Sequence, residues 1–253
     1  MGLSNNQWER FQEFLLKLYQ QNRLDGIQKM VMDYLELEIA HHCSMFDYGR
    51  AKDGEIIFFH PYSGNLDQGA LKDYYKNYQY QDYMVWNFSQ TEPFVYRNSD
   101  LMPDSMREKS PIYQRWMQPL QVYHGLGCTI VNRHFYGSVT MFRTKETGDF
   151  TRDELYLLKI LNTHLASHLS MLYPNGVRES DFQNIDMDKH WLKKYHLTER
   201  EMEIVLQLQE GLTNQEIGSR LCISEVTVKK HMSHIFGKMQ VKNRSQLLLK
   251  LEK

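Results

Sequence analysis

The side chains of this sequence that could do chemistry gather near its C-terminus. Residues 224–244 hold five lysines and arginines against one glutamate, a local net charge of +4, whereas the whole chain has a formal net charge of -1. Local positive charge beside small polar residues suits contacts with the phosphates and base edges of nucleic acid. The alternative is the solvated surface of a helical bundle, because runs of charge most often only face water.

Three short helices must position these side chains. Thr198 and Thr213 each stand three residues before a glutamate, the capping box that begins a helix, and Ser224 can cap a third helix. Gly211 suits the end of the first helix, since glycine adopts the left-handed conformation that follows many helices. At 100° per residue, the third helix gathers four apolar side chains on one stripe: Val228, Met232, Ile235 and Met239.

The opposite face of the third helix is small and basic, and carries Val226, Lys229, Lys230, Ser233 and Gly237. Two short helices joined by a tight turn, the second presenting such a face, form a helix-turn-helix. In that geometry we expect Lys229, Lys230 and Ser233 to reach base edges, and Lys238 and Arg244 to contact the DNA backbone.

The same segment closely resembles the LuxR-type helix-turn-helix family. The matching residues are "LTERE" at 197–201, Gly211, "TNQEI" at 213–217, Leu221, "IS" at 223–224, "TVKKH" at 227–231, Ile235, Lys238, Val241 and "NR" at 243–244. The resemblance implies a homodimer on double-stranded operator DNA that acts on the transcription machinery, with the third helix in the major groove. The expected DNA-binding residues are Thr213, Asn214, Val226, Thr227, Lys229, Lys230, Ser233, Lys238 and Arg244.

The last helix, "RSQLLLKLEK", has more leucines than one inward face needs. We expect Leu247 and Leu251 to face inward, which leaves Leu248 and Leu249 for a dimer contact. A frayed hydrophobic end is the alternative.

Residues 1–175 predict an α+β domain with an antiparallel sheet flanked by helices. Amphipathic helices are expected over 4–19 and 25–39, and a longer one from Thr151 to about Tyr173. Short β-rich segments lie between them and form two hairpins: one turns at Asp53-Gly54, and the other joins 126–132 to 136–144.

Residues 176–194 contain proline, glycine, asparagine and aspartate without a clear apolar period, which indicates a linker. The predicted organisation is therefore a sensing and dimerisation domain over 1–175, this linker, and an all-α four-helix DNA-binding domain over 195–253.

The order of elements in the first domain resembles GAF- and PAS-like sensor domains, and more loosely the autoinducer-binding domains of LuxR proteins. The looser resemblance lies in Tyr78-x-x-x-Asp82 and "EPFVY". Where that family has its tryptophan and first tyrosine, this chain has Gly69 and Asp73, so an acyl-homoserine lactone is not expected. An aromatic-rich domain can hold an apolar pocket with a few polar anchors. The candidate ligand-binding residues are Tyr62, Tyr74, Tyr78, Asp82, Trp86, Tyr96 and Trp116.

Two alternatives stay open for the first domain. Its aromatic residues can be ordinary core material, in which case the domain is a protein-interaction and dimerisation module without a ligand. An enzyme with an appended helical bundle is the remote alternative, because no nucleophile, phosphate-binding or paired-carboxylate motif is present.

Other features exclude further classes of protein. His164 and His168 share a helix face, but without a third ligand a metal site is not expected, and no cofactor is predicted. Three scattered cysteines form no disulfide framework. Charged residues interrupt the N-terminal segment, and there is no run of eighteen apolar residues. We therefore expect a cytoplasmic protein without membrane contacts.

Overall fold

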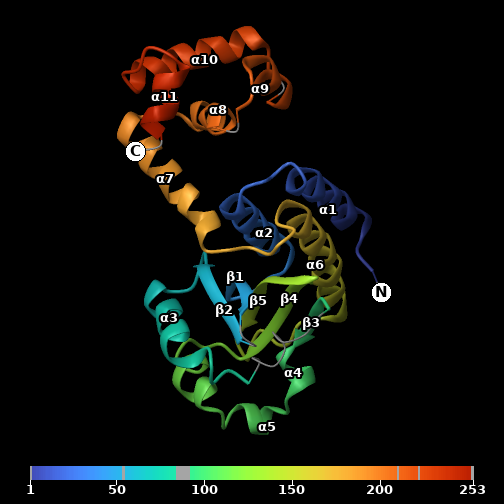
Figure 1. Ribbon diagram of the computed structural model, residues 1–253. Helices are drawn as coiled ribbons and strands as arrows, with labels where there is room; N and C mark the ends of the chain where they lie inside the picture. Colours follow the sequence, from blue (N-terminus) through green and yellow to red (C-terminus); the bar gives the residue numbers. More distant parts are fainter. Residues whose placement is uncertain (1, 53–54, 84–91, 210, 222, 252–253) are drawn as a thin grey trace. The chain divides into compact units, whose positions relative to one another are not determined.

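The computed structural model describes residues 2–52, 55–83, 92–209, 211–221 and 223–251, without the side chains of 183–190. The chain divides into two compact units, Met1–Glu179 and Ser180–Lys253. The first is an antiparallel sheet flanked by helices, and the second is helical (Figure 1). The predicted fold class is therefore confirmed.

One five-stranded sheet forms the centre of the first unit. Its strands are β1 (Cys43–Lys52), β2 (Glu55–Tyr62), β3 (Phe94–Arg97), β4 (His124–Asn132) and β5 (His134–Arg143), in the order β2-β1-β5-β4-β3. Every neighbouring pair is antiparallel. Both predicted hairpins are confirmed. Lys52 pairs with Glu55 across residues 53–54, which lie outside the described residues, and Arg133 with φ 61° turns between β4 and β5.

Three helices cover one face of the sheet: α1 (Asn5–Leu18), α2 (Leu24–Glu38) and α6 (Arg152–Leu172), seen together on one side in Figure 1. Capping boxes at Ser4 and Thr151 begin α1 and α6, so the three predicted helices are confirmed. Two buried amides join the layers. The Gln28 amide of α2 donates to the Phe46 carbonyl oxygen at 2.8 Å, and the Asn162 amide of α6 donates to the Thr129 carbonyl oxygen at 2.9 Å.

Short helices cover the other face of the sheet. The sequence alone predicted no helices or strands in this part of the chain. These short helices are α3 (Gln68–Asp73), η1 (Tyr74–Tyr78), α4 (Asn98–Leu101), α5 (Asp104–Arg107) and η3 (Tyr113–Met117). Figure 1 shows α3, α4 and α5 on the side of the sheet away from α2 and α6. Two of these elements, η1 and η3, are π-helical turns, which occur mostly as single turns and often at functional sites.

The second unit consists of α7 (Ser180–Tyr195), α8 (Glu199–Gln209), α9 (Asn214–Arg220), α10 (Glu225–Lys238) and α11 (Arg244–Leu251). The last four helices are the predicted four-helix domain, and their buried apolar residues form one core. The stretch predicted as a linker contains most of α7, although its sequence has no clear apolar period. Trp191, which is buried in the core of this unit, anchors the C-terminal end of that helix.

Candidate nucleic-acid interface and ligand pocket

The turn between α9 and α10 is tight enough to require a glycine. The Ile223 amide donates to the Gly218 carbonyl oxygen at 2.9 Å, which folds the chain back at the end of α9. A Cβ atom on Gly218 would lie 2.8 Å from the Ile223 carbonyl oxygen, too close for any larger residue without a shift of the backbone. This contact fixes how α10 leaves α9.

Hydroxyl groups begin all three helices as predicted. The Thr198 and Thr213 hydroxyls accept from the amides of Glu201 and Glu216, whose carboxylates in turn accept from the Thr198 and Thr213 amides. Ser224 caps α10 by accepting from the Thr227 amide at 3.1 Å. The Thr213 hydroxyl also donates to Glu216 at 2.8 Å, so this candidate DNA contact already has partners inside the unit.

The apolar stripe predicted for α10 is buried, because Val228, Ile235 and Met239 are 0% exposed and Met232 is 6% exposed. The opposite face is open to solvent. Val226 is 70% exposed, and Lys229, Lys230 and Ser233 are also exposed. The remaining candidates, Asn214 and Thr227, are half-buried.

The two lysines on this face differ in their surroundings. Lys229 forms an ion pair with Glu225, one turn earlier on the same helix, at 2.7 Å, and both side chains are exposed. Such a pair contributes little in water. Within the described part of the chain, no acidic side chain pairs with Lys230. A phosphate or a guanine edge could therefore engage Lys230 without breaking an existing ion pair.

Lys238 and Arg244 lie in contacts within the unit. The Lys238 ammonium is 2.6 Å from a carboxylate oxygen of Glu201, whose side chain is 4% exposed, and this ion pair joins the end of α10 to the start of α8. Burial acts to raise the pKa of Glu201, but hydrogen bonds from Lys238 and Thr198 outweigh it, and the pKa lies below its usual range. The Arg244 guanidinium donates to the Leu208 carbonyl oxygen at 3.3 Å, at the end of α8.

The leucines of α11 divide as the sequence suggested except for Leu248, which packs against the core instead of facing away from it. Leu247 and Leu251 are buried in the core of the unit, Leu248 is half-buried beside it, and Leu249 is 61% exposed. Leu249 therefore presents an apolar side chain to solvent. A dimer contact through it stays a prediction.

The first unit contains a pocket on the sheet face opposite α2 and α6. Its cavity volume is about 50 Å³. Its floor is formed by Met45 and Asp47 of β1 and by Ser138, Thr140 and Phe142 of β5. These are alternate residues because successive side chains of a strand point to opposite faces.

Aromatic residues from the short helices form the walls of this pocket. Tyr74 of η1 and Trp116 of η3 both line it, with their ring centroids 5.2 Å apart. The Trp116 indole donates to the Ala70 carbonyl oxygen at 2.9 Å, and the Tyr74 hydroxyl donates to Asp82 at 2.9 Å. Tyr96 of β3 adds a third ring. Both π-helical turns thus place an aromatic side chain in the same cavity.

Asp47 lies on the pocket floor beside an irregularity of the sheet. Phe46 and Tyr48, two residues apart on β1, pair with Tyr62 and Phe59, three residues apart on β2. The extra residue of β2 falls opposite Asp47, at His60-Pro61, where His60 has φ 50°. Bulges re-aim side chains and recur beside functional sites, and proline lacks the amide hydrogen that a regular ladder needs.

The Asp47 carboxyl is almost fully buried, with 6% of the residue exposed. Burial raises the pKa of Asp47 to about 7, although hydrogen bonds from the Tyr75 and Ser138 hydroxyls act in the opposite direction. Ser138 is the residue directly opposite Asp47 in the pairing of β1 with β5. The sheet register and η1 therefore both supply donors to this carboxyl.

A glycine lets β5 approach this part of β1. A Cβ atom on Gly137 would lie 2.1 Å from the Asp47 carbonyl oxygen, which no side chain could tolerate without displacing the strand. The backbone at Asp47 is therefore held by close packing as well as by strand pairing.

The structure gathers only some of the predicted ligand-binding residues. Tyr74, Asp82, Tyr96 and Trp116 line the pocket. Tyr62 and Tyr78 are half-buried outside its described lining, and Trp86 lies outside the described residues. Sequence reasoning missed Asp47 and Ser138. The one available signal was an aspartate within the otherwise apolar strand "CSMFDY", where a charge needs a reason to be buried.

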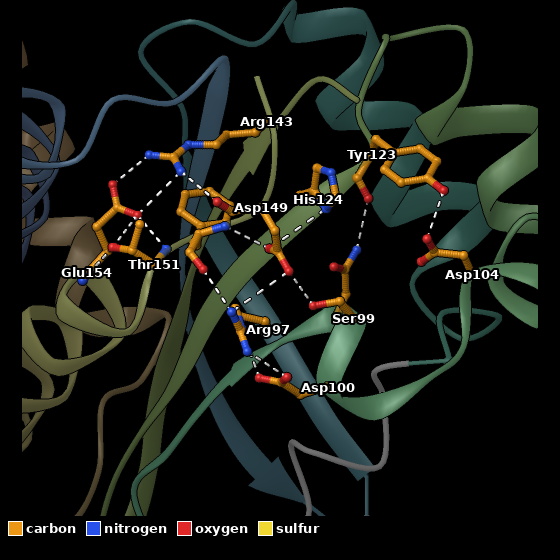
Figure 2. Close-up of polar contacts among 12 residues, drawn as sticks. Arg97, Ser99, Asp100, Asp104, Tyr123, His124, Arg143, Asp149, Thr151 and Glu154 are labelled. Carbon is orange, nitrogen blue, oxygen red and sulfur yellow. Dashed lines mark hydrogen bonds and ion pairs between the residues drawn. The ribbon is translucent and has the colours of Figure 1, made fainter. Parts of the chain in front are cut away.

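A polar network outside the pocket holds its α4 wall in place (Figure 2). Arg97 of β3 donates to Asp100 of α4 at 2.7 Å and to the Phe150 carbonyl oxygen at 2.8 Å. The Ser99 hydroxyl of α4 donates to Asp149 at 2.5 Å. Arg143 of β5 reaches Glu154 at the start of α6 at 2.6 Å, as Figure 2 shows. Hydrogen bonds thus link α4, which carries Asn98 of the pocket lining, to β3 and to the segment that precedes α6.

The histidine pair of α6 contacts the connection between α1 and α2. Nδ1 of His164 lies 2.9 Å from the Tyr19 hydroxyl, and Nε2 of His168 lies 2.7 Å from the Gln21 carbonyl oxygen. Among the residues that the structure describes, no group of three or more His, Cys, Asp or Glu could hold a metal ion. In the same part of the chain, no helix is long and apolar enough to cross a membrane.

Comparisons with known proteins bear mainly on the second unit. Residues 195–251 match the family of bacterial regulatory proteins termed the luxR family. LnrK, a transcriptional regulatory protein of Bacillus subtilis, is 41% identical over 69 residues, which are 27% of this chain and 31% of LnrK. VraR, a response regulator protein of Staphylococcus aureus, is 49% identical over 53 residues, which are 21% of this chain and 25% of VraR. The chain thus matches less than a third of the length of these relatives.

Among solved structures, SdiA of Escherichia coli has a TM-score of 0.47 at 17% identity, with coverage of 96% of this chain and 95% of SdiA. The second unit, with its capped helices and its family match, is a LuxR-type helix-turn-helix domain.

Proposed function

We propose that this chain, whose second unit is a LuxR-type DNA-binding domain, is a transcription regulator that binds operator DNA as a dimer and responds to a small molecule bound by its first unit. The observation that carries the proposal is the face of α10. Its buried stripe holds the helix in the domain, and its solvent face presents Lys229, Lys230 and Ser233 together.

These three side chains suit direct recognition of base edges. A lysine ammonium donates to the O6 and N7 acceptors of guanine, and a serine hydroxyl can donate or accept. Val226, at the start of the same face, offers an apolar contact of the kind that reads a thymine methyl group.

The proposed response to a small molecule rests on the pocket of the first unit. A ligand that binds one arrangement of the dimer more tightly than another shifts the population toward that arrangement, and with it the fit of two α10 helices to their half-sites. The pocket favours this mechanism over a simple packing core, because polar carboxyls and aromatic rings converge on one cavity.

A module for protein contact without a ligand is the second candidate for the first unit. Exposed apolar side chains favour it: Leu16 of α1 is 67% exposed and Met171 of α6 is 75% exposed. Filling the pocket would leave operator binding unchanged if this were the only role of the unit.

Selection of bound fragments from random duplex DNA, followed by titration of the recovered sequence, tests the DNA assignment. We expect Lys229→Ala and Lys230→Ala each to weaken specific binding by about 10- to 100-fold, the range that one base-reading side chain contributes. Lys193→Ala, which removes an exposed lysine of α7, is the matched control and should change affinity far less. Equal affinities of wild type and both α10 variants would refute the assignment.

A further inference from the structure

One glycine on the exposed face of α10 is not required by the second unit itself. The unit contains three glycines, Gly211, Gly218 and Gly237. Gly211 has φ 88°, which side chains rarely allow, and Gly218 lies against the Ile223 carbonyl oxygen. Gly237 has neither property. Its φ is not positive, and a Cβ atom there would meet no described atom within 4 Å apart from its chain neighbours and the nearby backbone of α10.

A glycine inside a helix lowers the stability of that helix. Gly237 lies in the C-terminal half of α10, where the Met239 amide still donates to the Ile235 carbonyl oxygen at 2.8 Å. Alanine stabilises a helix more at such a position, because glycine loses more backbone freedom when the helix forms. A helical glycine that its own domain does not require suits the close approach of another molecule to the backbone.

The position of Gly237 on the helix indicates which molecule approaches. At 100° per residue, four exposed residues fall within about 60° of the circumference of α10, at spacings of four, three and four: Val226, Lys230, Ser233 and Gly237. Gly237 is thus on the same stripe as the side chains that face base edges in the proposed function. The local net charge of +4 over residues 224–244 favours a polyanion at this surface.

We propose that Gly237 is a contact residue of the DNA-binding face, where the bare backbone of α10 lies directly against the duplex. This inference rests on the proposed function and adds a residue that acts through the absence of a side chain. The major groove is about 12 Å wide and a helix with its side chains is about 10–12 Å across, so one added methyl group matters. A side chain at position 237 holds the C-terminal half of α10 away from the groove, and Lys230 and Ser233 then lose their base edges.

Titration of the full chain with the duplex that the wild type selects from random DNA tests the inference. We expect Gly237→Ala to weaken binding to this duplex at least about tenfold, the effect of losing one good base contact, and Gly237→Leu to weaken it further. Affinity for a random duplex of the same length should change less than about threefold, because non-specific binding depends on phosphate charge, which neither substitution alters.

The stability of α10 separates a contact with DNA from a structural role. In the free protein, Gly237→Ala should slow amide hydrogen exchange in α10 by about fourfold, which corresponds to the difference in helix propensity between alanine and glycine. The variant should therefore bind DNA less tightly although its helix is more stable. Gly64→Ala is the matched control, because Gly64 is also exposed with no described atom within 4 Å of an added Cβ, but lies in the first unit. Its affinity for DNA should equal that of the wild type.

Three results overturn the inference: Gly237→Ala weakens binding to the selected duplex less than about tenfold, it weakens binding to the random duplex just as much, or it speeds hydrogen exchange in α10. The last result would show that the unit itself requires this glycine. Failure of this inference alone leaves Lys229→Ala and Lys230→Ala weakened while Gly237→Ala binds as the wild type does. A wild type that selects no duplex, or lysine variants that bind like the wild type, would refute the proposed function and this inference with it.

Discussion

Replacing Asp47 with asparagine should change the way in which the stability of the first unit depends on pH. In the folded chain, burial raises the pKa of Asp47 to about 7, whereas an aspartate in an unfolded chain titrates near 3.9. Between these values the folded chain keeps a proton that the unfolded chain has released. The unfolded state is therefore favoured progressively as pH rises through this window.

The size of the effect follows from linkage. Each pH unit in the window costs about 1.4 kcal/mol of unfolding free energy, so the full window of about three units costs about 4 kcal/mol. The contribution of the protonated Asp47 carboxyl to the unfolding free energy is complete below pH 4, is lost between pH 4 and 7, and stays lost above pH 7. Asparagine cannot titrate. The unfolding free energy of Asp47→Asn minus that of the wild type should accordingly rise by about 4 kcal/mol from pH 4 to pH 8.

The neighbours of Asp47 do not obscure this difference. Tyr74 and Tyr75, which face it from η1, have pKa values that burial raises well above the usual range for tyrosine, so neither titrates between pH 4 and 8. Ser138, on β5, does not titrate. Asp82 lies in the same pocket, but it is present in both proteins and its effect is largely removed by the subtraction.

Urea unfolding of the full chain, followed by tryptophan fluorescence in a Trp191→Phe background, measures the difference. The other three tryptophans, at positions 8, 86 and 116, all belong to the first unit. Asp33→Asn, which removes an exposed carboxylate, serves as the control. A difference between wild type and Asp47→Asn that stays constant from pH 4 to pH 8 would show that Asp47 is not buried as a protonated acid.

Three further substitutions test other parts of the structure. Lys238→Ala should lower the unfolding free energy of the second unit by about 2–3 kcal/mol, because it leaves the buried Glu201 carboxylate without its cation. Urea unfolding followed by Trp191 fluorescence measures this change, and a loss below about 0.5 kcal/mol would contradict the prediction. Gly137→Ala should destabilise the first unit by more than about 2 kcal/mol, since its Cβ would lie 2.1 Å from the Asp47 carbonyl oxygen; thermal unfolding unchanged from wild type would show that β1 and β5 are not so close. Thr213→Ala should cost about 1 kcal/mol through the loss of the α9 cap, while Thr213→Ser should keep the cap and the stability, which the same urea unfolding checks.

The helices could be predicted because their signals are local. Capping boxes at Thr151 and Thr213 and apolar residues spaced three and four apart depend only on residues within a turn or two of each other. For the same reason the exposed face of α10 could be assigned from helical angle alone. The helix α7 was not foreseen, because Pro174, Gly176 and the polar residues that follow suggested a linker, while the burial of Trp191 depends on other helices.

The pocket could not be predicted from such local signals. Its walls are π-helical turns, and an aromatic-rich segment such as 74–78 has no apolar period that distinguishes a π-turn from a loop. Tyr74 and Trp116 were chosen for their residue type, but that they meet in one cavity depends on tertiary packing, with ring centroids 5.2 Å apart.

Asp47 illustrates a physical difference between the pocket and the exposed face of α10. Whether an aspartate on a strand faces solvent or a pocket depends on strand register, and a shift of one residue would move it to the other face. Here the register is set by Ser138 opposite Asp47, 91 residues downstream in the chain, and by the bulge at His60-Pro61, 13 and 14 residues downstream. The exposed face of α10 repeats a local pattern that many sequences share, whereas the lining of the pocket depends on these non-local contacts. A chain can therefore keep a recognisable DNA-binding domain while the chemistry of its pocket diverges.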